Sequence, residues 1–158
     1  MSQQVATSLD KQMLVGGDWV GAQERTDVIH PYDGQLVGSV PMASEETVVE
    51  AIDAAAEAFH AADLSAYQRY ELLSQTARLV EERADEIAHI LTSEQGKPLT
   101  EARGEVDRAV QTLDLSAEQA KRLFGEFIPM DAQKGFARDH CFTQREPMGV
   151  VAAITPFN

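Results

Sequence analysis

The stretch Gly149-Val150-Val151-Ala152-Ala153-Ile154, followed by Thr155-Pro156-Phe157-Asn158, decides the fold class of this chain. An unbroken apolar run rich in Val is typical of a strand that is buried on both faces of a parallel α/β sheet. Pro156 has no N–H to give to a sheet, so we expect the strand to end there. Such a strand needs neighbours on both sides, and the sequence stops at Asn158. We therefore expect the chain to be the front portion of a larger protein.

The first third of the sequence has the pattern of two β-hairpins. Residues 13–20 place two glycines between short apolar runs, which predicts a hairpin with a glycine turn. Residues 26–40 predict a second hairpin that folds at Tyr32-Asp33-Gly34-Gln35, where Gly34 tolerates a positive φ. Residues 1–11 are polar and are expected to form a disordered tail.

Three or four helices are expected next. Ser44 and Ser65 have the pattern of helix N-caps, each followed by apolar residues at helical spacing. A further short helix is expected to begin at Asp85 and to end at Gly96. The longest helix is expected from Thr100 to Phe124, where apolar residues form a continuous stripe.

The segment after the helices is expected to contain one further strand. Ile128-Pro129-Met130-Asp131 is interpreted as a connector. Residues 139–146 could form a half-buried strand with Cys141, Thr143 and Arg145 on one side, because polar and apolar residues alternate there.

Composition excludes several classes of partner. The net charge is −13, from 26 acidic and 13 basic residues. No basic patch is present to neutralise phosphate, so neither nucleic acid nor an anionic membrane is an expected partner. An acidic surface with few lysines suits a protein solvated in concentrated salt, which predicts a halophilic source; the alternative is an ordinary acidic cytosolic protein. The N-terminus has no secretory pattern and the chain has one cysteine, so we expect a cytoplasmic location.

Four segments, in matching order and spacing, carry a resemblance to the NAD(P)-dependent aldehyde dehydrogenase superfamily. They are Ile29-His30-Pro31-Tyr32-Asp33-Gly34, Glu94-Gln95-Gly96-Lys97-Pro98, Ala102-Arg103-Gly104-Glu105-Val106, and Arg145-Glu146-Pro147-Met148-Gly149-Val150-Val151 continuing to Ile154-Thr155-Pro156-Phe157-Asn158. The first is similar to the family's Asn-Pro-x-x-Gly turn, with His30 where Asn is usual. The resemblance extends from about Met13 onward and covers the front third or so of a family member.

The resemblance implies an α/β fold in which N-terminal β-hairpins and helices lead into a Rossmann-like parallel sheet, truncated after its first strand. Residues 12–136 would be the N-terminal hairpins and the helical part of the cofactor-binding domain. Residues 137–147 would supply a strand of the oligomerisation sheet, and residues 148–158 the first strand of the Rossmann-like sheet. A homo-oligomer, either a dimer or a tetramer, is therefore expected.

The family oxidises an aldehyde to a carboxylic acid by attack of a cysteine thiolate, hydride transfer to NAD or NADP, and hydrolysis of the thioester. The resemblance implies that the Asn158 carboxamide stabilises the oxyanion of the tetrahedral intermediate. From the residues alone, a cap of the following turn or helix is the favoured role for Asn158.

Ile154, Thr155, Pro156 and Phe157 match the place where the family binds the nicotinamide end of the cofactor, and simple packing at a strand end is the alternative. Phe157 replaces the more common Trp, as in relatives that resemble lactaldehyde and non-phosphorylating glyceraldehyde-3-phosphate dehydrogenases. This replacement favours a small polar aldehyde as the substrate.

Two classes of function are compatible with the sequence. Cys141 lacks a glycine-rich elbow and a nearby base, so it is not expected to be the nucleophile. The four histidines have no metal-ligand spacing, and no metal site is predicted. The family's nucleophile, its general-base Glu and its phosphate-binding glycines lie downstream of the matched part. The chain is therefore expected to be an inactive N-terminal fragment of an aldehyde dehydrogenase; the alternative is a non-catalytic interaction or structural module.

Overall fold

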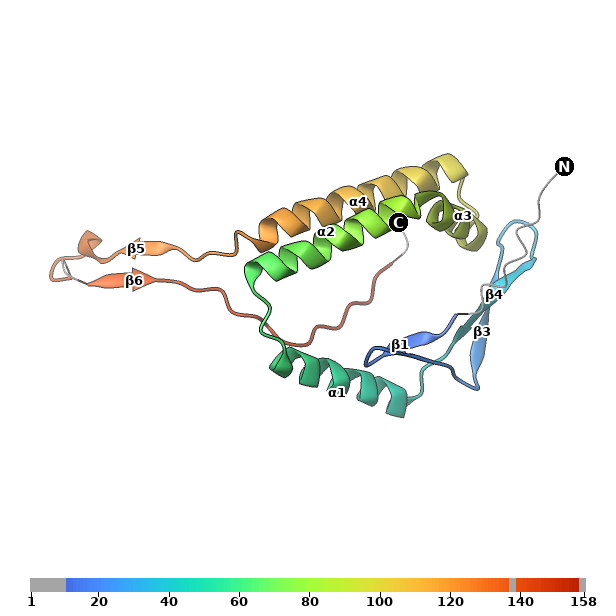
Figure 1. Ribbon diagram of the computed structural model, residues 1–158, viewed down its shortest axis with the longest axis horizontal. Coiled ribbons are helices and arrows are strands. Elements are labelled where there is room, and N and C mark those ends of the chain that lie inside the picture. The colour runs from blue at the N-terminus through green and yellow to red at the C-terminus, as the bar shows by residue number, and fades with distance from the viewer. Residues whose placement is uncertain (1–10, 137–138, 157–158) are drawn as a thin grey trace.

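Residues 11–136 and 139–156 are described by a computed structural model, in which four helices and three two-stranded antiparallel sheets occupy distinct regions (Figure 1). In this view the first two sheets lie at one end of the molecule, beside α1 and α3. The third sheet extends as an arm from the opposite end. The α/β class predicted from the sequence is confirmed.

The first hairpin forms as predicted. Strands β1 (Met13–Val15) and β2 (Asp18–Val20) pair antiparallel, with Leu14 opposite Trp19. The turn residues Gly16 and Gly17 have φ of 59° and 97°. Two successive positive φ angles match the right-handed twist of a tight hairpin and favour glycine at both positions.

The second hairpin is also confirmed, with strands β3 (Arg25–Ile29) and β4 (Leu36–Pro41). Its turn is held by the Asp33 carboxylate, which accepts a hydrogen bond from the Gln35 N–H at 3.0 Å. Gly34 has a φ of 72°, so the turn chemistry read from the sequence is the chemistry observed.

The predicted helix caps are present. Helices α1 (Glu45–Ala61) and α2 (Ala66–Glu82) begin after Ser44 and Ser65, whose hydroxyl groups each accept a backbone N–H bond at 3.2 Å. Helix α3 (Ala84–Gln95) ends at Gly96, which is left-handed with a φ of 69°. Helix α4 (Leu99–Ala120) follows after Pro98. These signals lie within one turn of each helix end, which is why the sequence alone could locate them.

The core lies between α2, α3 and α4 and is made of small side chains. The buried apolar residues in the described ranges are Ala77, Ala88, Ala102, Val106, Ala117 and Ala120. Alanine permits close helix packing but removes little apolar area from water. Many of the larger side chains on these helices therefore remain exposed.

Two of the segments that carry the family resemblance meet in this core. The Lys97 ammonium, just beyond α3, forms an ion pair with the Glu105 carboxylate of α4, and both side chains are largely buried. Two residues before Glu105, Arg103 donates to Asp85 of α3 at 2.9 Å. These two ion pairs hold α3 against α4. That contact is a structural reason for the spacing between the two segments.

Helix α4 ends earlier than predicted, at Ala120 rather than at Phe124. The Arg122 N–H bonds to the Gln119 carbonyl at 2.8 Å, which tightens the last turn and turns the chain away. The chain then enters the base of the arm, where Glu126 pairs with Thr143. This long-range pairing determines the direction of the chain after Ala120, and helix periodicity cannot reveal it.

The arm corrects the prediction of a connector at residues 128–131. Phe127–Pro129 is strand β5, Met130–Ala132 is the 3-10 turn η1, and His140–Phe142 is strand β6. Ile128 lies opposite Cys141 in the antiparallel pair. The predicted strand over residues 139–146 is therefore present but shorter, and it pairs with the segment that was interpreted as a connector.

Residues 143–156 form no regular secondary structure, and the described residues contain no parallel sheet. A strand that is buried on both faces needs neighbours on both sides, and no other described strand pairs with this segment. The Rossmann-like sheet and the domain boundaries placed around it remain predictions.

Replacing Gly96 with Ala is expected to destabilise the chain more than replacing Gly34. Both glycines have positive φ, which costs a residue with a side chain about 1–2 kcal/mol. At Gly96 a Cβ would also lie 2.7 Å from Pro31 Cγ, whereas nothing lies within 4 Å at Gly34. We expect Gly96→Ala to lower the free energy of unfolding by about 1 kcal/mol more than Gly34→Ala. Urea denaturation measures both, and equal losses would contradict the role of the Pro31 contact.

Candidate functional site

The C-terminal segment that carries the predicted site residues is extended and open to solvent. Ile154 is 98% exposed, and Thr155 and Pro156 are also exposed. Phe157 and Asn158 lie outside the described residues. Three of the five predicted site residues can therefore be placed, and they lie next to one another on one exposed edge.

The preceding residues of this segment rest against α1 and the first hairpin. Gly149 has a φ of 95°, which allows the chain to turn after Met148. A hollow of about 370 Å³ then follows, lined by Met13, Leu14, Val15, Ala43, Thr47, Val48, Ala51, Ile52, Ala55, Val150, Val151 and Ala152. The apolar face predicted for α1 therefore lines one hollow together with the C-terminal segment, and no residue of α1 is buried.

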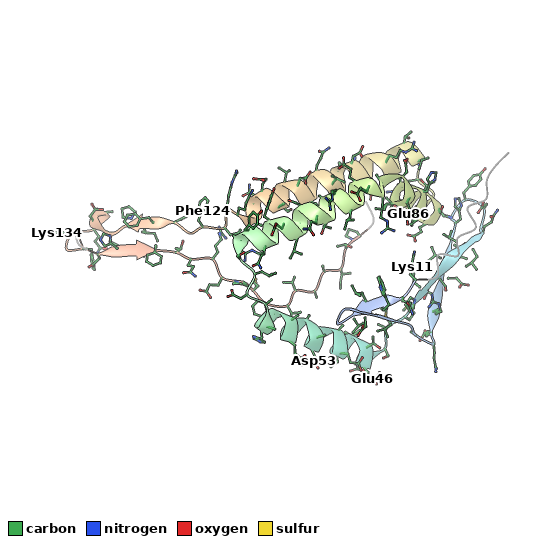
Figure 2. All side chains as sticks on the ribbon, in the orientation of Figure 1. Lys11, Glu46, Asp53, Glu86, Phe124 and Lys134 are labelled. Carbon is green, nitrogen blue, oxygen red and sulfur yellow. The ribbon has the colours of Figure 1, made fainter. Side chains whose placement is uncertain are left out.

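Two carboxylates at helix starts, Glu46 of α1 and Glu86 of α3, have lowered pKa values. A bond from its own backbone N–H, together with the Ser44 side chain, lowers the pKa of Glu46. The bond from the Arg83 guanidinium lowers the pKa of Glu86. Both carboxylates lie at the first turns of their helices, where the helix dipole favours negative charge (Figure 2). These groups stabilise helices and do not form a catalytic pair.

Cys141 lies in a different region from the predicted site. It is half-buried in β6 of the arm, whereas residues 150–152 line a hollow with α1. Within residues 11–136 and 139–156 no group of three His, Cys, Asp or Glu side chains could hold a metal ion. Over the same residues, no helix combines the length and apolar character that crossing a bilayer requires.

A second apolar surface, which the sequence reading did not identify, lies between α2 and α4. We call it the α2–α4 groove; it has a volume of about 680 Å³ and is lined by Arg69, Leu72, Leu73, Thr112, Leu115, Ser116, Gln119, Ala120 and Leu123. Leu115 and Leu123 are eight residues apart and lie outside the apolar stripe predicted for α4. Leu115 lies in α4 and Leu123 lies three residues beyond its end, so helical spacing could not have revealed the groove.

The described part of the predicted site is open to solvent. Ile154 is almost fully exposed, and the segment around it is extended. The described residues do not bring a nucleophile and a base together beside it.

Comparison with known proteins places this arrangement in a family. The model of the Aldehyde dehydrogenase family matches residues 19–158. The 3-sulfolactaldehyde dehydrogenase of Priestia aryabhattai is 41% identical over 146 residues, which cover 92% of this chain and 30% of the relative.

Two solved structures are similar over the same part. An NAD-dependent aldehyde dehydrogenase from Sinorhizobium meliloti has a TM-score of 0.76 and 33% identity, covering 81% of this chain and 27% of that one. The NADP-dependent glyceraldehyde-3-phosphate dehydrogenase from Bacillus halodurans, complexed with NADP, has a TM-score of 0.76 and 34% identity, covering 81% and 28%. The chain thus spans less than a third of the length of these relatives, which use NAD or NADP, and it belongs to the aldehyde dehydrogenase family.

Proposed function

We propose that this chain is the N-terminal part of an enzyme that oxidises a small polar aldehyde to a carboxylic acid with NAD or NADP, through a cysteine thiohemiacetal. The observation that carries this proposal is the family match over residues 19–158, which includes the C-terminal segment with all predicted site residues. The Priestia relative, named for 3-sulfolactaldehyde, supports a small polar substrate.

In this proposal the C-terminal segment acts at two places. Ile154, Thr155, Pro156 and Phe157 line the nicotinamide end of the cofactor, which accepts the hydride when bound. The Asn158 carboxamide donates an N–H to the oxyanion that forms when a thiolate attacks the aldehyde carbonyl. A single donor of this kind lowers a barrier by about 3–4 kcal/mol. The nucleophile and the general base would come from residues that follow the matched part in relatives.

The arm would join subunits of a dimer or tetramer. Phe127 and Phe142, which lie opposite each other in β5 and β6, are mostly exposed, and neither strand has a second neighbour among the described residues. An open strand edge beside exposed aromatic side chains is a surface to which another chain can add.

The acidic surface supports a further part of the proposal, namely a cytoplasmic enzyme that works in concentrated salt. With a net charge of −13 the chain repels itself at low ionic strength, and salt screens that repulsion. Activity and stability are therefore best measured both in dilute buffer and in about 2 M KCl.

A second candidate function is an interaction module without activity of its own. The large exposed apolar surface on the helices favours it, because monomeric proteins rarely leave such surfaces uncovered. The two candidates predict different behaviour for a chain that is extended by the rest of a relative. The first predicts aldehyde oxidation, and the second predicts none.

The test compares the 158-residue chain with a chimera in which residues 1–158 are followed by the part of the Priestia relative that comes after its matched segment. We expect no aldehyde oxidation by the chain alone, because the nucleophile, the base and the phosphate-binding segment are missing. We expect the chimera to reduce NAD or NADP with a small polar aldehyde, as measured by the absorbance of the reduced cofactor. Turnover by the chain alone that requires Cys141, or a folded but inactive chimera, would contradict the proposal.

A further inference from the structure

The turn between β3 and β4, residues 30–35, contains a histidine ring nitrogen with two neighbours that it cannot serve at once. His30 Nδ1 lies 3.3 Å from the Tyr32 backbone nitrogen, in the geometry of an accepted hydrogen bond. The same atom lies 3.2 Å from Asp33 Oδ1. A ring nitrogen carries either a lone pair or a proton, so Nδ1 either accepts from the Tyr32 N–H or donates to the Asp33 carboxylate.

The other hydrogen bonds of this turn do not depend on the imidazole ring. The Gly34 N–H donates to the His30 carbonyl, and the His30 N–H donates to the Gln35 carbonyl, each at 2.9 Å. The Asp33 carboxylate also accepts from the Gln35 N–H at 3.0 Å. These bonds hold the backbone of the turn, so a proton gained or lost by His30 exchanges one contact of its ring for the other and leaves the turn folded.

The turn packs against the end of α3, where further charged groups lie. A Cβ on Gly96 would lie 2.7 Å from Pro31 Cγ, so the proline ring rests directly on the residue that ends α3. Glu94 and Lys97 flank Gly96 in the chain, and the Lys97 ammonium is paired with a carboxylate of α4. Among the described residues, the carboxylate within ion-pair distance of the His30 ring is that of Asp33.

We infer that His30 makes this turn a proton-dependent switch that acts on the end of α3. When Nδ1 is unprotonated it accepts from the Tyr32 N–H, and when acid protonates it the ring donates to Asp33 instead. Histidine is the side chain that ordinarily changes charge between pH 5 and 8, so the exchange takes place close to neutrality.

The switch reaches α3 through the proline of the turn. The Tyr32 N–H belongs to the peptide group that joins this residue to Pro31. When its hydrogen bond is lost, the peptide group is free to tilt and to move the proline ring against Gly96. The Asn that is usual in the family at position 30 does not titrate in this range, so a turn built on Asn lacks the switch.

Nuclear magnetic resonance of the 158-residue chain tests the switch atom by atom. Between about pH 8 and pH 5 we expect the His30 Nδ1 resonance to change from that of an unprotonated to that of a protonated ring nitrogen. Over the same range, protection of the Tyr32 amide against exchange with water, corrected for intrinsic exchange, should fall about 5-fold. Protection of the Gly34 amide, which donates to a backbone carbonyl, should change less than about 2-fold. The Gly96 amide resonance should shift with the same midpoint as His30 Nδ1.

Two variants separate the switch from general effects of acid. His30→Asn keeps a side-chain acceptor for the Tyr32 N–H without a titrating group, so the changes at Tyr32 and Gly96 should disappear. His60→Asn removes an exposed histidine from α1 and should leave both changes as they are in the parent chain.

A proton on Nδ1 at both ends of the pH range would overturn the inference, as would constant protection of the Tyr32 amide. The same changes in His30→Asn would assign them to other groups and overturn it as well. A Gly96 resonance that does not move would overturn the link to α3. None of these outcomes involves aldehyde oxidation, so the proposed function is tested separately.

Discussion

Replacing Asn158 with Ala in the active chimera is expected to lower kcat by about 100- to 1,000-fold. The substitution removes the carboxamide N–H that we propose stabilises the oxyanion, and it leaves the apolar contacts of residues 154–157 in place. The Kd for NAD or NADP should therefore change little. This pattern of a slow chemical step with normal cofactor binding is typical of a group that acts only in the transition state.

A capping role for Asn158 predicts the opposite pattern. Loss of a helix or turn cap costs about 1 kcal/mol of stability and leaves turnover by each folded molecule nearly intact. Measuring kcat and the unfolding midpoint on the same preparation separates the two roles. Gln111→Ala is the matched control, since it removes an exposed carboxamide from α4, outside the C-terminal segment. If turnover survives in Asn158→Ala while the midpoint falls, the catalytic role is wrong.

Replacing Gly125 with Ala is expected to open the base of the arm. A Cβ at this position would lie 1.6 Å from the Thr143 carbonyl oxygen and 2.4 Å from its carbon, so the two backbones would have to move apart. Two hydrogen bonds would be lost, from the Thr143 N–H to the Glu126 carbonyl and from the Glu126 N–H to the Thr143 hydroxyl, each 2.9 Å long. An isolated two-stranded hairpin is only marginally stable, so the pairing of β5 with β6 should be lost as well.

Hydrogen exchange measures this effect. We expect the Thr143 amide to exchange about 100-fold faster in Gly125→Ala, which corresponds to about 3 kcal/mol of local stability. Gly104→Ala in α4 is the control, because its nearest contact would be Arg108 Nη1 at 3.6 Å and alanine favours a helix by about 1 kcal/mol. Unchanged protection of Thr143 in Gly125→Ala would show that the close approach at the base of the arm does not hold the arm together.

The structural features that the sequence predicted correctly depend on residues close together in the chain. The glycine turn of the first hairpin, the Asp33-Gly34 turn and the Ser65 capping box each involve residues within four positions of one another. Backbone preference and short-range hydrogen bonds decide such features before any tertiary contact forms. They could therefore be located from the sequence, often to the residue.

The candidate site was predicted more from the family resemblance than from local chemistry. Residues 154–156 lie together on one exposed edge, as expected for consecutive residues of an extended segment. Their role depends on groups that the described residues do not contain, so the structure places them without testing that role. The α2–α4 groove was missed because Leu115 and Leu123 acquire a common function only when α4 lies beside α2.

The sequence by itself therefore determined the α/β class, the hairpins, the helix starts and membership of a family, because each depends on short-range pattern or on ordered motifs. Tertiary structure alone decided three things: the pairing of β5 with β6, the end of α4 at Ala120, and which leucines stay exposed. Each of these depends on contacts between segments far apart in the chain. The free energy of such contacts comes from apolar area that distant segments bury together and from hydrogen bonds between them. The sequence of one segment therefore does not reveal it.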